Sequence, residues 1–153
     1  MKSIKVLIKK EADAEGLPLP AYQTSGSSGL DLHAAIKAPT TLLPGETKLV
    51  STGISISIPE GYEGQVRPRS GLALKHGITL LNAPGTIDSD YRGIISVIMT
   101  NLGREPFTVE RGMRIAQLVF GPVARAELEV VPELDETARS NQGFGHTGHG
   151  IKR

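Results

Sequence analysis

The segment from Arg67 to Ala73 carries groups that could bind an anion. Two arginines flank a proline, which fixes the backbone between them, and Ser70 stands where a short helix is expected to begin. Guanidinium donors, a hydroxyl and the free backbone amides of a helix start suit a phosphate group. Taken alone, an arginine-ended strand before a short helix is more often a surface turn, so the segment needs support from other residues.

A second group of reactive side chains lies in a predicted hairpin loop between Leu81 and Ile94. The loop contains two carboxylates, an aromatic ring and a cation: Asp88, Asp90, Tyr91 and Arg92. By default such a loop is a solvated turn. Close to a bound phosphate, one of its carboxylates could instead act as a general base or help to hold a metal ion.

The stretch from residue 139 onward is rich in glycine, and Phe144 is its only large apolar residue before Ile151. Such a stretch cannot bury enough surface to offset its ordering entropy, so we expect a mobile tail unless a ligand binds it. Arg139, the glycines and the Phe144 ring are groups that could close over a charged, planar ligand.

Two other patterns in the tail favour no site. The glycines at 143, 145 and 148 have the spacing of a dinucleotide fingerprint, but that motif needs a helix after it and an acidic residue about 20 positions later. The chain ends at Arg153. His146 and His149 would supply only two zinc ligands on a glycine-rich segment, whereas zinc requires three or four rigid ones.

The elements that must position these groups are predicted to be strands. From Gly53 to Ile58, three isoleucines alternate with serines, a period of two that places the isoleucines on one face. Similar patterns predict strands over residues 4–8, 30–34, 47–51, 65–67, 78–81, 94–100, 106–109, 115–120 and 127–131. Ser70 is expected to cap a helical turn that His76 and Gly77 close. The prediction is an all-β fold, a jelly-roll-like barrel or sandwich with one short helix and a flexible C-terminal tail.

The composition excludes several classes of protein. The 153 residues fit one domain, and 17 Lys and Arg against 16 Asp and Glu leave a net charge of +1. No basic stripe is visible, so we expect no nucleic acid polymer as partner. The absence of cysteine excludes disulfides, thiol chemistry and cysteine-based zinc sites. No apolar run approaches the roughly 18 residues of a membrane span and no signal peptide is evident, so we expect a cytoplasmic protein without a membrane partner.

Taken in order along the chain, five segments resemble the five motifs of the trimeric deoxyuridine triphosphatase (dUTPase) family. They are residues 29–32, 68–73, 85–93 and 111–118, and Arg139 with residues 143–148. Any one segment could arise by chance, but five in the family's order and approximate spacing are a strong signal. The chain departs from the family at Ser28, where Ala is usual, and at Ser140, where Gly is usual. Ser140 could stiffen the hinge of the tail slightly, because Gly reaches backbone conformations that Ser does not.

The resemblance implies a jelly-roll domain over residues 1–138 and a mobile C-terminal arm over residues 139–153 that closes over the active site. It also implies a homotrimer with shared active sites. The implied reaction hydrolyses dUTP to dUMP and pyrophosphate with Mg²⁺, water attacking the α-phosphorus. That reaction limits uracil incorporation into DNA and supplies dUMP for dTMP synthesis.

The resemblance also assigns roles to single residues. Asp88 resembles the residue that positions and deprotonates the water, and Asp31 the one that reaches the metal through water. Tyr91 resembles the ring that packs on the deoxyribose and leaves no room for a 2′-hydroxyl, and Asn82 resembles the group on the uracil edge. The residues implied in substrate binding are Arg69, Ser70, Gly71, Asn82, Thr86, Ile87, Tyr91, Gln117, Arg139, Phe144 and Gly145.

Two alternatives remain beside this interpretation. A dCTP deaminase shares the implied fold. By resemblance, those enzymes need a Glu at the position that Ile98 occupies in this chain, and an apolar side chain cannot shuttle protons. A non-catalytic nucleotide-binding jelly-roll protein is the other alternative. The joint presence of Asp88, Tyr91, Arg139 and Phe144 argues against it.

Overall fold

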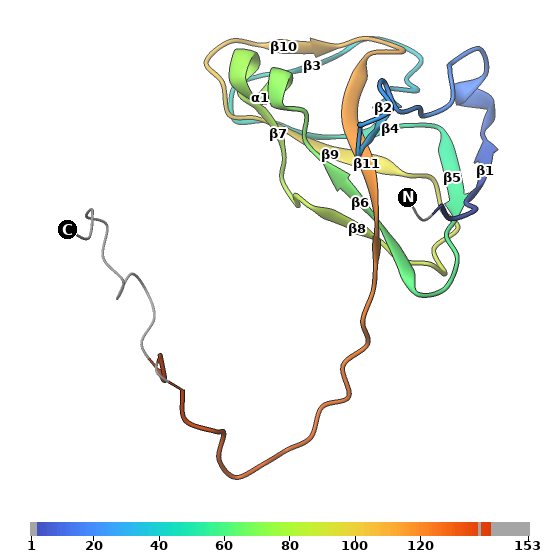
Figure 1. The fold of residues 1–153 in the computed structure, drawn as a ribbon. Helices are drawn as coiled ribbons and strands as arrows, with labels where there is room; N and C mark the ends of the chain where they lie inside the picture. Colours follow the sequence, from blue (N-terminus) through green and yellow to red (C-terminus); the bar gives the residue numbers. More distant parts are fainter. Residues whose placement is uncertain (1–2, 138, 142–153) are drawn as a thin grey trace.

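Short antiparallel strands make up most of the chain in this computed structural model, which describes residues 3–137 and 139–141 (Figure 1). The strands are β1 (Leu7–Lys10), β2 (Leu30–His33), β3 (Thr40–Leu42), β4 (Thr47–Ser51), β5 (Ile54–Ser57), β6 (Tyr62–Arg67), β7 (Ile78–Leu80), β8 (Gly85–Ile87), β9 (Ser96–Asn101), β10 (Phe107–Val109) and β11 (Arg114–Pro122). A 3-10 helix, η1 (Ala12–Ala14), and one α-helix, α1 (Ser70–His76), interrupt the strands of the described residues.

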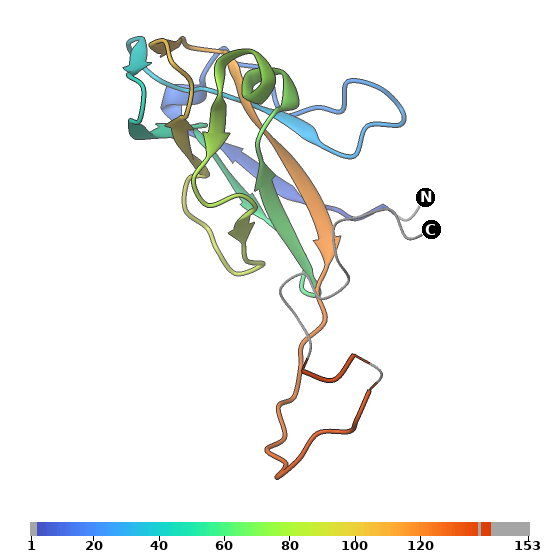
Figure 2. The same ribbon diagram turned by 90° about the vertical axis from the view of Figure 1, so that its left-hand side faces the viewer.

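Two sheets position the candidate site. One has the strand order β2-β11-β6-β8 and the other the order β4-β9-β7. In the first sheet, Gln117 of β11 lies opposite Asp31 of β2 on one side and Arg67 of β6 on the other. Figure 2 shows β6 and β11 running side by side. The register therefore brings three segments that are far apart in the sequence to one region of the sheet.

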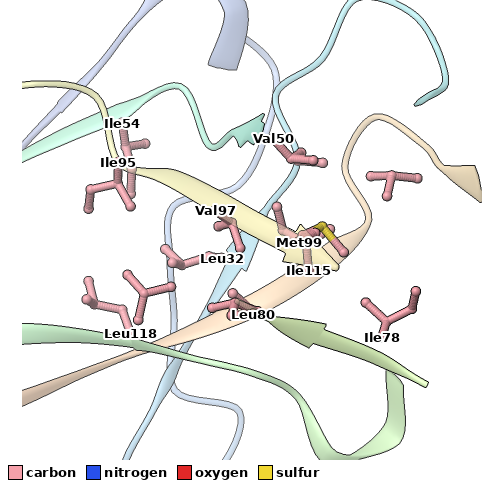
Figure 3. Close-up of a cluster of buried hydrophobic side chains, with 14 of the residues drawn as sticks. Leu32, Val50, Ile54, Ile78, Leu80, Ile95, Val97, Met99, Ile115 and Leu118 are labelled. Atoms are coloured by element: carbon pink, nitrogen blue, oxygen red, sulfur yellow. The ribbon is translucent and has the colours of Figure 1, made fainter. Parts of the chain in front are cut away.

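The hydrophobic core fills the space between these sheets. Figure 3 shows side chains of β9, such as Val97 and Met99, in one cluster with side chains of β11, such as Ile115 and Leu118. All four are at most 2% exposed. Burying each such side chain stabilises the fold by roughly 1.5–3 kcal/mol. The predicted all-β jelly-roll fold is confirmed.

Helix α1 differs from its prediction at one end. It ends as predicted, because Gly77 adopts a left-handed φ of 68° and donates its N–H to the carbonyl of Ala73. At the other end, the prediction that Ser70 caps the helix is wrong. Arg69 is the capping residue and makes no side-chain capping hydrogen bond, while Ser70 is the first helical residue. The Ser70 hydroxyl is therefore not used as a cap.

Most predicted strands are present, but several details differ from the prediction. The first strand begins at Leu7 rather than at residue 4, and the sequence patterns missed β3 and β8. Residues 127–131 form no strand, because they have no ladder partner within the described part of the chain. Leu128 and Val130 are 94% and 99% exposed. Figures 1 and 2 show this segment leaving the body of the fold after β11.

Within the range that the structure describes, no helix is both long enough and apolar enough to cross a membrane.

Candidate active site

A hollow of about 570 Å³ lies where α1 meets β2 and β11. We call it the phosphate hollow, after the phosphate group that the sequence predicts for Arg69 and Ser70. Residues from three of the five motif segments contribute to its wall, among them Gly29, Asp31, Arg69, Ser70, Arg114 and Gln117. Its size is within the range of ordinary ligand sites.

Asp31 is the centre of the charge arrangement in the phosphate hollow. Its Oδ1 accepts a hydrogen bond from Nε of Arg69 at 3.1 Å, and its Oδ2 accepts one from Nη1 of Arg114 at 3.0 Å. The Asp31 side chain is only 10% exposed, whereas those of Arg69 and Arg114 are 26% and 46% exposed. Two cations against one carboxylate leave an excess positive charge facing the hollow, which favours an anionic ligand.

Gln117 connects the same hollow to the backbone around it. Its Nε2 donates to the carbonyl of Pro68 at 2.9 Å, which orients the amide. Gly29 lies against this side chain, since a Cβ on Gly29 would meet Oε1 of Gln117 at 2.6 Å. Gly29 therefore allows the close approach of the loop before β2 to the Gln117 side chain.

A second hollow, of about 360 Å³, lies beside β8 and β9, and we call it the base hollow, after the uracil base that the family resemblance predicts for Asn82. Its lining includes all five predicted residues of the hairpin: Asn82, Thr86, Ile87, Asp88 and Tyr91. A Cβ on Gly85 would approach Nδ2 of Asn82 to 3.1 Å, so the glycine leaves room for that amide.

Tyr91 is held by its neighbours in the turn. Its hydroxyl donates to the carbonyl of Ile94 at 3.2 Å. A Cβ on Gly93 would clash with the Tyr91 ring, so the ring lies directly against the backbone of Gly93. Tyr91 is 46% exposed, so part of its side chain is accessible to a ligand.

Asp88 and Asp90 occupy different surroundings. Asp88 follows β8, its carbonyl accepts the N–H of Tyr91 at 3.2 Å, and it lines the base hollow. Both carboxylates line a neighbouring hollow with Glu60 and Glu63, but Asp90 does not line the base hollow. Asp88 is therefore the carboxylate of this loop that shares a cavity with Asn82 and Tyr91.

His33 lies two residues after Asp31 on β2 and is partly buried. Burial lowers the pKa of His33; the nearby Asp31 carboxylate opposes this, while the guanidinium groups of Arg114 and Arg69 add to it. Its Nδ1 is buried and has no hydrogen-bond partner among the described residues. The neutral imidazole is therefore the favoured form in the folded chain.

The described residues fit a water-mediated Mg²⁺ better than a directly bound one. They contain no group of three or more His, Asp or Glu side chains that could hold a metal. Both Asp31 oxygens already accept a guanidinium, but each carboxylate oxygen has a second lone pair that can accept a hydrogen bond from water. Mg²⁺ keeps several of its waters and takes much of its remaining coordination from substrate phosphates. Asp31 therefore fits the predicted role through water.

Within one chain, the predicted site residues fall into separate groups. Arg69, Ser70, Gly71, Gln117 and Asp31 line the phosphate hollow, and the hairpin residues line the base hollow. Phe144 and Gly145 lie outside the described residues. Arg139 is described, and Ser140 after it has a positive φ of 45°. Ser140 thus adopts the left-handed backbone that glycine would reach with less strain.

Arg114 is the residue that sequence reasoning missed. It belongs to the segment 111–118, but nothing in the sequence linked it to Asp31. The signal is visible only in the β2–β11 register, in which Arg114 lies opposite His33 and a bulge follows before Ala116.

The fold and the two hollows define an all-β jelly-roll protein with an arginine-lined cavity. Residues 15–148 match the family model described as dUTPase. The chain is 56% identical over 146 residues to a deoxyuridine 5′-triphosphate nucleotidohydrolase of Caldanaerobacter subterraneus subsp. tengcongensis, covering 95% of this chain and 99% of that protein. It is 60% identical over 148 residues to the protein of the same name from Beijerinckia indica subsp. indica, covering 95% and 92%. The chain belongs to the dUTPase family.

Solved structures agree with this fold. A Staphylococcus bacteriophage 80alpha dUTPase with dUPNHPP superposes with a TM-score of 0.86 at 25% identity, over 96% of this chain and 100% of that chain. A mutant dUTPase from phage phi11 of S. aureus, described for the coordination of a structural Mg(II) ion, has a TM-score of 0.77 at 23% identity, over 87% and 100%.

Proposed function

We propose that this chain hydrolyses dUTP to dUMP and pyrophosphate. The observation that carries the proposal is the base hollow, where Asp88 shares one cavity with Asn82 and Tyr91. Membership of the dUTPase family supports the same reaction. By this activity the protein would limit uracil incorporation into DNA and supply dUMP for dTMP synthesis.

In the proposed reaction, Asp88 orients a water molecule and accepts its proton. The water oxygen forms a bond to the α-phosphorus, and the bond from that phosphorus to the oxygen bridging the α- and β-phosphates breaks. Pyrophosphate leaves with the electron pair of that bond. The Asp88 side chain is exposed, so its carboxylate oxygens are open to contact with the water.

The phosphate hollow would hold the charged end of the substrate. Arg69, the Ser70 hydroxyl, the Gly71 amide and Gln117 are the donors that we assign to phosphate oxygens. A triphosphate carries about four negative charges, and positioned cations offset them while charge moves to the leaving group. When bound, Mg²⁺ would neutralise phosphate charge, and Asp31 would hold it through water.

We assign the substrate's uracil and deoxyribose to the base hollow. Asn82 and the backbone of its hairpin, with Thr86 and Ile87, would contact the base, and Tyr91 would pack on the sugar. A 2′-hydroxyl would meet the Tyr91 ring, and a 5-methyl group would crowd the hairpin.

We also propose a homotrimer in which different subunits complete each active site. Support comes from the two hollows, because one chain presents the phosphate and base residues in separate cavities. The extended segment after β11 adds support, because its apolar side chains find no cover within the described chain. In this arrangement the arm of residues 139–153 would close over a neighbouring site, with Arg139 on the γ-phosphate and Phe144 and Gly145 at the base.

The test is a phosphate-release assay with added pyrophosphatase, run with dUTP, dTTP, dCTP and UTP. We expect turnover of dUTP far above the other three, because steric exclusion and unpaired polar groups can discriminate by several powers of ten. Comparable turnover of dTTP or UTP would contradict the assigned base hollow.

The same assay separates a dUTP hydrolase from both alternatives, since neither of them releases phosphate, and an ammonia measurement with dCTP separates those two from each other. A deaminase would release ammonia from dCTP, and a non-catalytic binding protein would release nothing. Ile98 lines the base hollow, so an apolar side chain occupies the place where the deaminase resemblance requires a Glu.

A further inference from the structure

Helix α1 forms a wall of the phosphate hollow along most of its length. Ser70 and Gly71 at its start and Lys75 and His76 at its end all line that hollow. None of the residues of α1 is fully buried, only Leu72 packs in part against the core, and no side chain caps its start. The position of the helix therefore depends strongly on how its C-terminal end is fixed.

The end of α1 is seated on the turn that follows β9. The carbonyl of Gly77 accepts the N–H of Leu102 at 2.9 Å. A Cβ on Gly77 would lie 2.5 Å from the amide nitrogen of Gly103, and a Cβ on Gly103 would clash with the carbonyl oxygen of His76. The two glycines therefore allow backbone-to-backbone contact between the helix end and the turn.

One buried side chain holds this turn. Asn101 is fully buried, and its Nδ2 donates to the carbonyls of Leu42 and Glu105, both at 2.9 Å. Its Oδ1 accepts the N–H of Gly103 at 2.8 Å. The side-chain amide thus satisfies all its close partners and connects β3, β9 and the turn in one place.

We infer that Asn101 is a positioning residue for the phosphate hollow. Asn101 lines neither hollow. It holds the turn at 102–105, and this turn holds Gly77 at the end of α1. The position of α1 then determines where Arg69 and Ser70 lie. The inference rests on the proposed function only for its kinetic readout. The seat of the helix is a property of the fold.

The test compares Asn101→Asp with the wild type. Aspartate has nearly the same shape and still accepts the N–H of Gly103, but it offers no donors to the carbonyls of Leu42 and Glu105. A second variant, Gly103→Ala, disturbs the contact between the turn and the carbonyl of His76 at the end of α1. It tests the inference if Asn101→Asp does not fold. The control is Thr108→Val, which removes the exposed hydrogen bond between Thr108 and Thr41 and does not reach α1.

Two measurements are made on each folded variant, well below its melting temperature. Calorimetry measures binding of inorganic triphosphate, of dUMP and of a non-hydrolysable dUTP analogue. The hydrolysis assay measures kcat and KM for dUTP. We expect kcat/KM for dUTP to fall roughly 10- to 100-fold, because small misplacements of binding groups have effects of this size. The affinity loss should be large for inorganic triphosphate and the analogue and small for dUMP.

Equal losses for dUMP and the analogue would indicate general loosening and would overturn the inference. Wild-type affinity for inorganic triphosphate in folded Asn101→Asp or folded Gly103→Ala would also overturn the inference. A wild type without dUTP turnover would refute the proposed function alone, since triphosphate binding still reports on the seat of α1.

Discussion

Arg114 pairs with Asp31 at 3.0 Å, although the two residues are 83 positions apart in the sequence. Together with Arg69 it surrounds the buried carboxylate that lines the phosphate hollow. We expect Arg114→Met to raise KM for dUTP roughly 10-fold. This is the lower end of the effect of losing a hydrogen bond to a charged group, and we choose it because Arg114 is half exposed.

The matched control for Arg114 is Arg67→Met. The Arg67 guanidinium contacts the neutral Gln65 side chain, outside the phosphate hollow. Steady-state kinetics should show little change in this variant. Equal KM values for the two variants would show that Arg114 takes no part in substrate binding.

Asp88→Asn keeps the shape of the side chain and removes the base. We expect kcat to fall roughly 10²- to 10⁴-fold with nucleotide binding largely kept, the usual contribution of a general base. Asp90→Asn should lose much less, because Asp90 does not line the base hollow. Single-turnover rates and calorimetric binding of dUTP check both variants, and reversed effects would make Asp90 the base.

Mixed trimers test whether subunits share active sites. Arg69→Ala and Asp88→Asn should each be nearly inactive alone, since each damages one hollow. If an active site takes Arg69 from one subunit and Asp88 from another, random mixing in equal amounts should restore about one quarter of wild-type activity over all trimers, and about one third in the isolated mixed trimers. Co-expression with two affinity tags provides the mixed species, and sedimentation measures their size. No recovery in confirmed mixed trimers would place both residues of each site on one chain.

Deletion of residues 139–153 should leave the assembly folded and reduce dUTP hydrolysis severely. Stacking of an aromatic ring on a base is worth roughly 1–3 kcal/mol, so Phe144→Ala should reduce kcat/KM about 5- to 150-fold. Phe120→Leu, on β11, serves as a control for loss of an aromatic ring elsewhere. Near-normal turnover of the truncated chain would mean that the arm takes no part in the site.

The lowered pKa of His33 predicts a loss of stability on mild acidification. The unfolded chain binds a proton at the ordinary pKa of 6.5, whereas the folded chain resists protonation until a lower pH. The contribution to stability is therefore complete above pH 6.5 and is lost as the pH falls through the folded pKa. Urea unfolding in EDTA, without nucleotide, should show a steeper decline below pH 6.5 for the wild type than for His33→Gln. Parallel pH profiles would exclude this role.

The sequence predicts strands best where an alternating pattern of side chains coincides with a pairing partner in the fold. β4 matches its predicted bounds, and the Ile54–Ser57 strand follows its alternation of Ile and Ser. Residues 127–131 carry the same alternation, yet they form no strand in the described chain, because a strand requires a partner as well as a pattern. The sequence does not predict β8, because Gly85 and Thr86 are typical of a turn. They form a strand in the structure because they pair with Val66 and Gln65 of β6.

The candidate site shows the same limit. Arg69, Asp88 and Tyr91 could be selected from local chemistry and family resemblance. The pairing of Arg114 with Asp31 and the support of α1 by Asn101 depend on contacts between distant segments. Sequence spacing does not determine such contacts, because strand register and loop paths set them.

The segment after β11 has a consequence for the solubility of the chain. Leu128, Val130 and Leu134 are each at least 84% exposed on backbone that lacks a ladder within the described residues. Segments of this kind tend to pair with copies of themselves and to aggregate. Here Glu127, Glu129 and Glu133 alternate with the apolar side chains and place like charges on both members of any such pair. These acidic residues thus act as gatekeepers, which oppose fibre-like stacking of newly made chains.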